Sequence, residues 1–94
     1  MNTNPLKLFV FSKSGCPYCS LLKLELTKRR FVFTEIDVSD DTTRQVFYEA
    51  SGNKTVPQVY ASGEEVSHNT PSGVHLGGWS DISNDWNRLE KILS

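Results

Sequence analysis

Residues 7–26 read KLFVFSKSGCPYCSLLKLEL and hold the only two cysteines of the chain, Cys16 and Cys19. The apolar run at residues 6–11 predicts a buried strand, and the leucine-rich run after the cysteines predicts a helix that begins near Pro17. The two thiols therefore fall where a strand meets the N-terminus of a helix. Because free N–H groups and the positive end of the helix dipole lie there, a thiol at this position can become a thiolate near neutral pH. We interpret the pair as a redox-active dithiol.

The spacing of the two cysteines predicts different chemistry for each. Residues three apart on a helix share a face, so Cys16 and Cys19 can form a disulfide with little backbone movement. We expect Cys16 to cap the helix and face water, and Cys19 to lie one turn further, more buried and with a higher pKa. Thiol–disulfide exchange needs an attacking thiolate and a second thiol that resolves the mixed disulfide. We therefore predict that Cys16 attacks and Cys19 resolves.

Composition limits the classes of function. The 94 residues predict one domain, and 37% hydrophobic with 22% charged residues is typical of a globular protein. A net charge of -1 gives no indication of a nucleic-acid or anionic-membrane partner. No run approaches the roughly 20 apolar residues of a membrane span, and residues 1–5 lack the pattern of a signal peptide. We therefore expect a cytoplasmic protein, and a monomer by default.

The histidines do not indicate a metal site. In a reducing compartment a C-x-x-C pair is more often catalytic or metal-binding than a structural disulfide. A structural zinc site normally needs four ligands, and His68 and His75 are not at zinc-finger spacing relative to the cysteines. We predict no metal and assign neither histidine a catalytic role.

Strand and helix signals alternate along the chain. A strand–helix–strand unit implies that its two strands pair in parallel, and two strands joined without a helix should be antiparallel. Asp81 is expected to cap the last helix, and a Ser/Asp/Thr cluster at residues 39–42 to start the second. The predicted elements are a strand at 6–11, a helix at 17–30, a strand at 31–38, a helix at 42–51, a strand at 56–61, a loop at 62–73, a strand at 74–76 and a helix from Asp81 to Leu93.

Three motifs together resemble one family. C-P-Y-C at 16–19, T-V-P at 55–57 and G-G-W-S-D at 77–81 occur in the order found in dithiol glutaredoxins, and the resemblance covers residues 6–93. It implies the thioredoxin fold, an α/β arrangement in which helices flank a central four-stranded mixed sheet in the order β-α-β-α-β-β-α. Residues 1–94 are then a single glutaredoxin domain.

The resemblance also implies a glutathione site. A cis Val56–Pro57 peptide is expected to place the backbone of Val56 beside Cys16, where an extended tripeptide could pair with it. Helix N-termini bind carboxylates, and the Asp81 carboxylate suits an ammonium group, so this end would hold the γ-glutamyl end of glutathione. Lys13 and Arg44 would meet the glycine carboxylate. The implied glutathione-binding residues are Lys13, Tyr18, Arg44, Thr55, Val56, Pro57, Gly78, Trp79, Ser80 and Asp81.

The predicted function is that of a glutathione-dependent thiol–disulfide oxidoreductase. It would reduce protein disulfides and glutathione mixed disulfides, with glutathione as reducing co-substrate and no bound cofactor; ribonucleotide reductase is a protein substrate that the resemblance allows. One alternative is a glutaredoxin-like protein reduced by thioredoxin reductase, which Lys13, Ser80 and Asp81 disfavour. The other is an iron–sulfur cluster carrier, disfavoured by Pro17 and by the second cysteine, because typical carriers of the family have a C-G-F-S motif.

One segment departs from the family pattern. Most relatives join the strand after T-V-P to the paired glycines through a tight hairpin, whereas residues 61–74 form a longer, polar loop. Such insertions cost little loop-closure entropy, so neutral variation is the first interpretation. The other is a loop that docks a partner near the active site.

Overall fold

Four strands form the central sheet of the computed structural model, which describes residues 6–93. They are β1 (Lys7–Ser12), β2 (Phe33–Asp37), β3 (Gln58–Ser62) and β4 (Val74–Gly77). The order in the sheet is β2-β1-β3-β4. β2 is parallel to β1, whereas β3 is antiparallel to both β1 and β4. This topology confirms the predicted mixed sheet. The N-terminal segment 1–5, on which the cytoplasmic prediction partly rests, lies outside the described residues.

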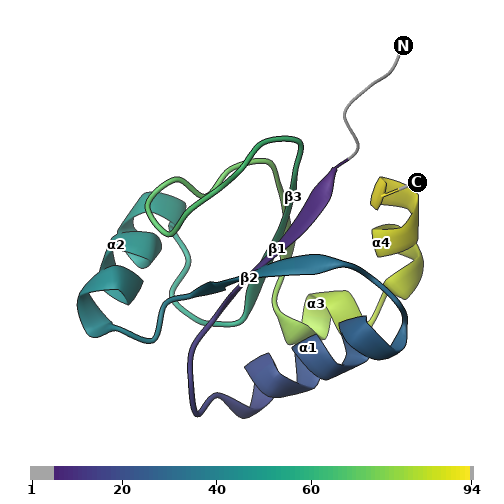
Figure 1. Ribbon diagram of the computed structural model, residues 1–94, viewed down its shortest axis with the longest axis horizontal. Helices are drawn as coiled ribbons and strands as arrows, with labels where there is room; N and C mark the ends of the chain where they lie inside the picture. Colours follow the sequence, from purple (N-terminus) through teal and green to yellow (C-terminus); the bar gives the residue numbers. More distant parts are fainter. Residues whose placement is uncertain (1–5, 94) are drawn as a thin grey trace.

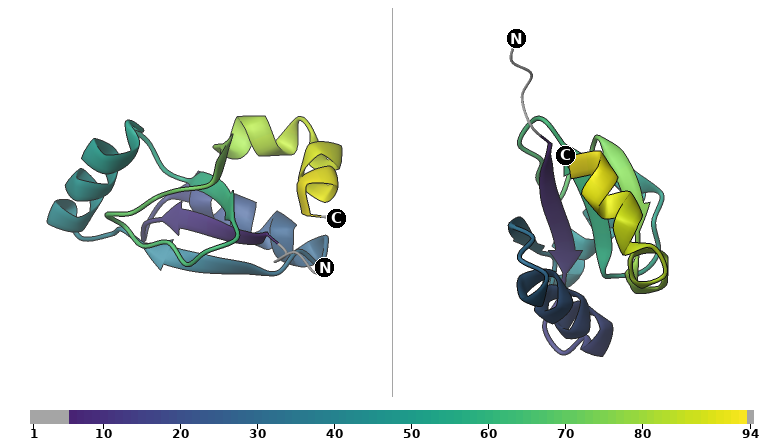
Figure 2. Two further views of the ribbon diagram at one scale, coloured as in Figure 1. Left: turned by 90° about the horizontal axis from the view of Figure 1, so that it is seen from above. Right: turned by 90° about the vertical axis from the view of Figure 1, so that its right-hand side faces the viewer.

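Helices cover both faces of the sheet. They are α1 (Pro17–Lys28), α2 (Asp41–Ser51), α3 (Trp79–Ser83) and α4 (Trp86–Leu93). Figure 1 shows α2 at one side of the sheet, apart from the other three helices, and Figure 2 gives two further views. None of these helices is long and apolar enough to cross a membrane, among the residues described.

Alternation along the strands divides the core into two clusters. Leu8 and Val10 of β1 point to the face covered by α1, α3 and α4, where they pack with Leu22, Leu26, Val59, Ala61, Leu76, Ile82 and Leu89. Phe9 and Phe11 point to the opposite face and pack with Val38, Phe47, Tyr60 and Val66. Because successive strand residues face opposite sides, one apolar strand serves both clusters. This explains why β1 reads as a continuous apolar run.

The connection between α1 and β2 differs from the prediction in where the helix ends and the strand begins. α1 ends at Lys28, and Arg30 adopts a left-handed φ of 67°. The Phe31 amide then donates to the Leu26 carbonyl, and the Phe31 ring stacks on Trp86 instead of joining the sheet. The second strand is therefore residues 33–37, shorter than the predicted 31–38.

The second helix begins and ends as its sequence predicts. The Asp40 carboxylate accepts from the Thr43 amide at 2.9 Å, and Gly52 ends the helix with a φ of 78°. Both are standard capping arrangements. The sequence also predicts an apolar face of Val46, Phe47 and Ala50, which is only partly right, because Phe47 is buried whereas Ala50 is exposed. Tyr48 packs against the cluster instead.

The last predicted helix is two helices. α3 ends at Ser83 with Asn84 as its C-cap, and the Asp85 carboxylate accepts from the Arg88 amide at 3.2 Å at the start of α4. Polar side chains that bind nearby backbone N–H groups interrupt helices and start new ones, which explains the break. Asp81 is also not the cap that was predicted. Gly78 is the N-cap of α3, and Asp81 lies three residues inside.

The long connection lies away from the dithiol. It covers residues 63–73 and leaves β3 after Ser62, at the opposite end of that strand from Pro57. In Figure 1 it arches along the edge opposite the start of α1. Val66 is 9% exposed and belongs to the cluster under α2, while Ser67 and Thr70 close a local turn. The connection therefore anchors to the core by one apolar side chain, and it does not border the cysteines as the docking-loop alternative assumed.

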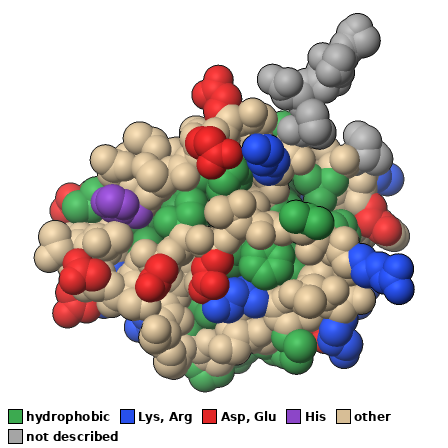
Figure 3. Space-filling view, in the orientation of Figure 1, with side chains coloured by type: hydrophobic (Ala, Val, Ile, Leu, Met, Phe, Trp, Pro, Cys, Tyr) green, Lys and Arg blue, Asp and Glu red, His purple; other side chains and the backbone are tan. Residues whose placement is uncertain are grey.

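The surface carries charges of both signs. In the face shown in Figure 3, acidic side chains gather on the side where α2 lies, and basic side chains are more frequent toward the opposite side. Three consecutive basic residues, at positions 28–30, lie at the C-terminus of α1. Lys28 is in the last turn of the helix, and Arg29 is its C-cap. Cations at this end complement the helix dipole.

Candidate active site

The two cysteines lie at the N-terminus of α1. Cys16 is the N-cap residue, Pro17 takes the first helical position, and the Cys19 amide donates to Cys16 Sγ at 3.2 Å. Both thiols are free. Cys16 is more covered than predicted, at 8% exposed, because the Val56 carbonyl oxygen lies 3.8 Å from its sulfur. The sulfur therefore sits between an N–H donor of the helix and the backbone of a distant segment.

Cys19 is the more buried thiol, as predicted. It is 1% exposed, and the pKa of its thiol is raised to about 12. Removal from water is the largest cause, since it disfavours the thiolate, and the hydrogen bond with Cys16 is the second. The Lys13 backbone and the Lys23 charge act in the opposite direction. Cys19 is thus held as a thiol while Cys16 is unmodified.

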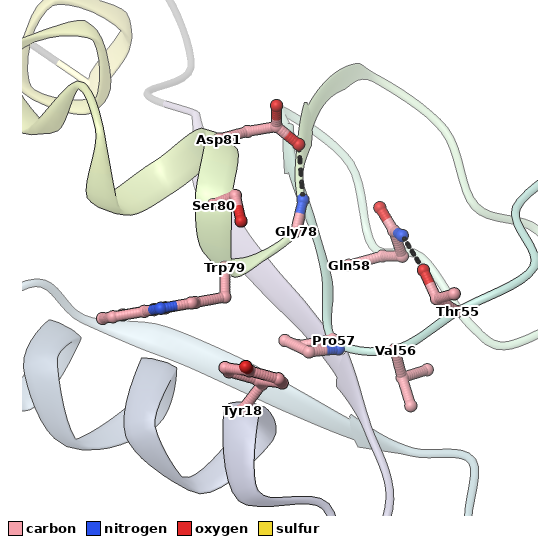
Figure 4. Close-up of a pocket in the computed structure, with 9 residues that line it drawn as sticks. All are labelled: Tyr18, Thr55, Val56, Pro57, Gln58, Gly78, Trp79, Ser80 and Asp81. Carbon is pink, nitrogen blue, oxygen red and sulfur yellow. Dashed lines mark hydrogen bonds between the residues drawn. The ribbon is translucent and has the colours of Figure 1, made fainter.

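A groove is lined by Val56, the residue whose carbonyl oxygen contacts Cys16, although neither cysteine lines it. It is a cavity of about 570 Å³, and Figure 4 shows Tyr18 and Trp79 on one side of Pro57 with Thr55 and Gln58 on the other. The Val56–Pro57 peptide is cis, which confirms that prediction. Eight of the ten predicted glutathione contacts line the cavity: Tyr18, Thr55, Val56, Pro57, Gly78, Trp79, Ser80 and Asp81.

Two glycines allow the far wall of the groove to form. A Cβ on Gly78 would lie 3.1 Å from the Pro57 carbonyl oxygen, so the lack of a side chain lets these two segments approach. Gly77 has a φ of 102°, and a Cβ there would lie 2.6 Å from that of Asp81. The Asp81 carboxylate accepts from the Gly78 amide at 3.1 Å, drawn in Figure 4. This contact holds the carboxylate at the edge of the groove.

Lys13 and Arg44 are not brought into the groove. Lys13 lines a second cavity of about 230 Å³ with Lys23, Glu35 and other residues near the dithiol loop. Arg44 Nη1 donates to the carbonyl oxygens of Val38 at 3.2 Å and Ser39 at 2.9 Å, and Arg44 also pairs with the Asp41 carboxylate. A ligand contact would require Arg44 to leave these partners, so its role stays a prediction.

The second cavity contains an ion pair that joins α1 to β2. Lys23 Nζ lies 2.6 Å from Glu35 Oε2, and the buried Ser12 hydroxyl donates to the same oxygen at 2.5 Å. The two hydrogen bonds, that of Lys23 first, hold the pKa of the Glu35 carboxyl below its usual range. They also fix Lys23 on α1, one turn after Cys19.

Gln58 lines the groove but is absent from the predicted set. It directly follows Pro57, is 7% exposed and donates from Nε2 to Thr55 Oγ1 at 3.1 Å. A polar side chain within the otherwise apolar predicted strand at residues 56–61 was the available signal in the sequence. Its hydrogen-bond partners depend on strand pairing, which the sequence does not display.

The described residues 6–93 contain no cluster of three or more His, Cys, Asp and Glu side chains arranged to hold a metal ion. A dithiol at the first helix of a four-stranded mixed sheet, with a cis-proline segment beside it, defines an oxidoreductase of the thioredoxin fold.

Comparison with known proteins narrows the class. The family model described as glutaredoxin matches residues 8–66. Glutaredoxin 1 of Rickettsia typhi is 32% identical over 91 residues, which cover 92% of this chain and 78% of that protein. The chain belongs to the glutaredoxin family and is a thiol–disulfide oxidoreductase.

Solved structures of glutaredoxins share the fold. Glutaredoxin 1 from Francisella tularensis, solved with cacodylate, has the same fold, with a TM-score of 0.73, 21% identity, and coverage of 92% of this chain and 98% of that one. The buckwheat glutaredoxin–glutathione complex has a TM-score of 0.70 and 25% identity, and it covers 96% of this chain and 78% of the buckwheat chain.

Proposed function

We propose that this glutaredoxin uses glutathione as its reductant and reduces protein disulfides and glutathione mixed disulfides, in the cytoplasm. The observation that carries the proposal is the groove of about 570 Å³, which is lined by Val56, whose carbonyl oxygen lies 3.8 Å from Cys16 Sγ, and by Asp81. A short extended peptide that pairs with Val56 would bring its thiol toward the Cys16 sulfur. The similar buckwheat glutaredoxin was solved with glutathione bound, which supports the same ligand here.

Charge and backbone groups along the groove match the ends of glutathione. The Asp81 carboxylate is suited to the ammonium of the γ-glutamyl end, and Ser80 adds a hydroxyl beside it. The backbone of Val56 offers hydrogen-bonding groups that an extended peptide could pair with as an added strand. Tyr18 and Trp79 supply apolar walls.

The reaction begins at Cys16. Its thiolate attacks one sulfur of a substrate disulfide, the substrate S–S bond breaks, and the departing thiolate takes a proton from water. Cys19 then loses its proton and attacks the Cys16 sulfur, which forms the Cys16–Cys19 disulfide and releases the second substrate thiol. Two glutathione molecules restore the dithiol and leave as glutathione disulfide. In the single-thiol route, glutathione itself displaces Cys16.

Modification of Cys16 prepares Cys19 to attack. Two of the causes that raise the pKa of Cys19 are its hydrogen bond with Cys16 and the charge on Cys16. A mixed disulfide at Cys16 carries no charge and is a weaker acceptor, so both causes diminish at the step where Cys19 must ionise. The Lys23 charge, which favours the Cys19 thiolate, remains.

The test is glutathione-coupled reduction of a small glutathione mixed disulfide by the wild type, Cys16→Ser and Cys19→Ser. We expect Cys16→Ser to be inactive and Cys19→Ser to keep turnover, because only Cys16 is needed in the single-thiol route. Reduction of a protein disulfide should be lost in both variants.

The alternatives give different results in the same experiment. A wild type that is inactive with glutathione but active with NADPH and thioredoxin reductase would replace glutathione with that reductase. Inactivity with both, together with visible absorption after anaerobic purification, would favour the cluster carrier.

A further inference from the structure

A chain of hydrogen bonds leads from β4 to the groove. His75 Nε2 lies 2.7 Å from Gln58 Oε1, and Gln58 Nε2 donates to Thr55 Oγ1 at 3.1 Å. Thr55 and Gln58 both line the groove, whereas His75 does not. We propose that His75 is a positioning residue for ligand binding: it orients the Gln58 amide so that the Thr55 hydroxyl donates its hydrogen to an acceptor oxygen of bound glutathione. This inference rests on the proposed function.

The chemistry of the amide sets the direction of the chain. A carboxamide oxygen only accepts, so its partner nitrogen in His75 must carry a hydrogen. The amide NH₂ only donates, so the Thr55 oxygen is an acceptor in its bond with Gln58. The hydroxyl hydrogen of Thr55 is then free for the ligand. The reverse amide orientation would make Thr55 the donor to Gln58 and remove that hydrogen from the groove.

Burial makes the orientation matter. Gln58 is 7% exposed, so its amide oxygen has little access to water if its partner in His75 is removed. A buried acceptor without a partner is unfavourable, and turning the amide to find another partner would relieve it. The Thr55 hydroxyl is the neighbouring donor for a turned amide. Loss of the His75 donor should therefore turn the Gln58 amide, so that the Thr55 hydroxyl donates to Gln58 and no longer to a ligand in the groove.

The imidazole is itself held in place. His75 pairs with Tyr60 across the β3–β4 ladder, and the two ring centroids lie 4.8 Å apart. The Tyr60 hydroxyl accepts from Asn53 Nδ2 at 2.9 Å. His75 is exposed, so its ring is held on one face by Tyr60 and through Nε2 by Gln58 Oε1. A variant can keep this packing while it removes the donor.

The experiment measures KM for glutathione and kcat for a small glutathione mixed disulfide. His75→Phe keeps a ring against Tyr60 but has no donor, and His75→Gln restores an N–H at similar reach. Thr55→Val removes the hydroxyl at nearly constant shape, and Thr55→Ser keeps it. His68→Phe makes the same change in the 63–73 connection and is the control. Thermal unfolding of every variant checks that each is folded.

We expect His75→Phe and Thr55→Val each to raise KM about fivefold, with kcat within about twofold of wild type, as for loss of one hydrogen bond to the ligand. His68→Phe should stay near wild type, and His75→Gln and Thr55→Ser should each bind glutathione more tightly than His75→Phe and Thr55→Val, respectively. The double variant His75→Phe with Thr55→Val should match Thr55→Val alone, because both changes remove one and the same donor.

Other outcomes overturn the inference. If the two KM effects multiply in the double variant, His75 does not act through Thr55. If His75→Phe leaves KM unchanged, or if His75→Gln is as impaired as His75→Phe, the donor has no positioning role. If His75→Phe does not fold, an unchanged KM in Thr55→Val overturns the inference by itself. A wild type without glutathione turnover would instead refute the proposed function.

Discussion

The two thiols differ because one caps a helix and the other lies beneath it. Cys16 accepts an N–H from the first turn of α1, whereas Cys19 is removed from water. The roles of attacking and resolving thiol follow from this difference. The attacking thiol must contact the substrate disulfide, and the resolving thiol must stay protonated until the mixed disulfide has formed. Both positions follow from the four residues of the C-P-Y-C motif and the helix that they start.

The pKa of Cys19 leads to a labelling prediction. With a pKa raised to about 12, Cys19 is held as a thiol at pH 8, and the thiolate is the reactive form. In the reduced native protein, brief treatment with iodoacetamide at pH 8 should modify Cys16 and leave Cys19 as a thiol, as read by peptide mass spectrometry. In guanidinium chloride both should react. Equal labelling of the native protein would contradict the assignment of roles.

Gly77 leads to a second prediction. Gly77→Ala would place a Cβ 2.6 Å from that of Asp81 at a φ of 102°, a conformation that costs about 1–3 kcal/mol for an L residue. We expect lower stability to urea and a KM for glutathione raised about tenfold, because the Asp81 carboxylate must move. Gly63→Ala is the matched control, since its Cβ would meet only Leu6, at 3.9 Å. If the two variants had equal stability to urea and equal KM for glutathione, the close contact between Gly77 and Asp81 would not restrict the residue at position 77.

The helices differ in how their boundaries arise. α2 is bounded by Asp40 and Gly52, whose capping preferences are local, and its bounds were predicted almost without error. The break between α3 and α4 is also made by local polar groups, yet it was missed. A regular apolar spacing from Ile82 to Leu93 continues through the break. Periodicity alone does not distinguish one helix from two that cover the same core.

α4 should contribute to stability through one buried leucine. Leu89 is 1% exposed in the cluster under α1, whereas Leu24 on α1 is 55% exposed. Leu89→Ala should lower the free energy of unfolding by about 2–4 kcal/mol through lost burial and a cavity. Leu24→Ala, the same change at the surface, should stay within about 0.5 kcal/mol. Urea unfolding followed by far-UV circular dichroism measures both, and similar losses would show that α4 does not pack as described.

The two core clusters share the strands of one sheet, so the described chain should unfold as one unit. Trp79 and Trp86 pack on the face of α1, while Phe47 lies on the opposite face, stacked on Phe11 at 4.3 Å. A substitution that destabilises the cluster on one face of the sheet should therefore also destabilise the cluster on the other face, because both contain side chains of β1. The prediction of a single domain depends on this coupling.

Phe47→Ala tests the coupling. It should lower the free energy of unfolding by about 3–5 kcal/mol. Tryptophan fluorescence and far-UV circular dichroism should still give coincident urea transitions, both shifted to lower urea. A tryptophan transition that stays at its wild-type midpoint would mean that the two faces unfold separately, contrary to a single domain.

The sequence by itself determined the features that depend on near neighbours. The dithiol, its helix, the caps of α2 and the order of elements follow from residues a few positions apart, because propensity and capping act over that range. The T-V-P and G-G-W-S-D motifs were recognisable through resemblance and supplied seven groove residues, and the C-P-Y-C motif supplied the eighth, Tyr18.

Only the tertiary structure decided which distant residues meet. Strand pairing brings Gly78 to Pro57, and it joins His75 to Gln58 across β3 and β4. The same pairing places the 63–73 connection at the far end of β3. These contacts depend on register and packing over many residues, because a pleated strand fixes the face and the neighbour of every side chain at once.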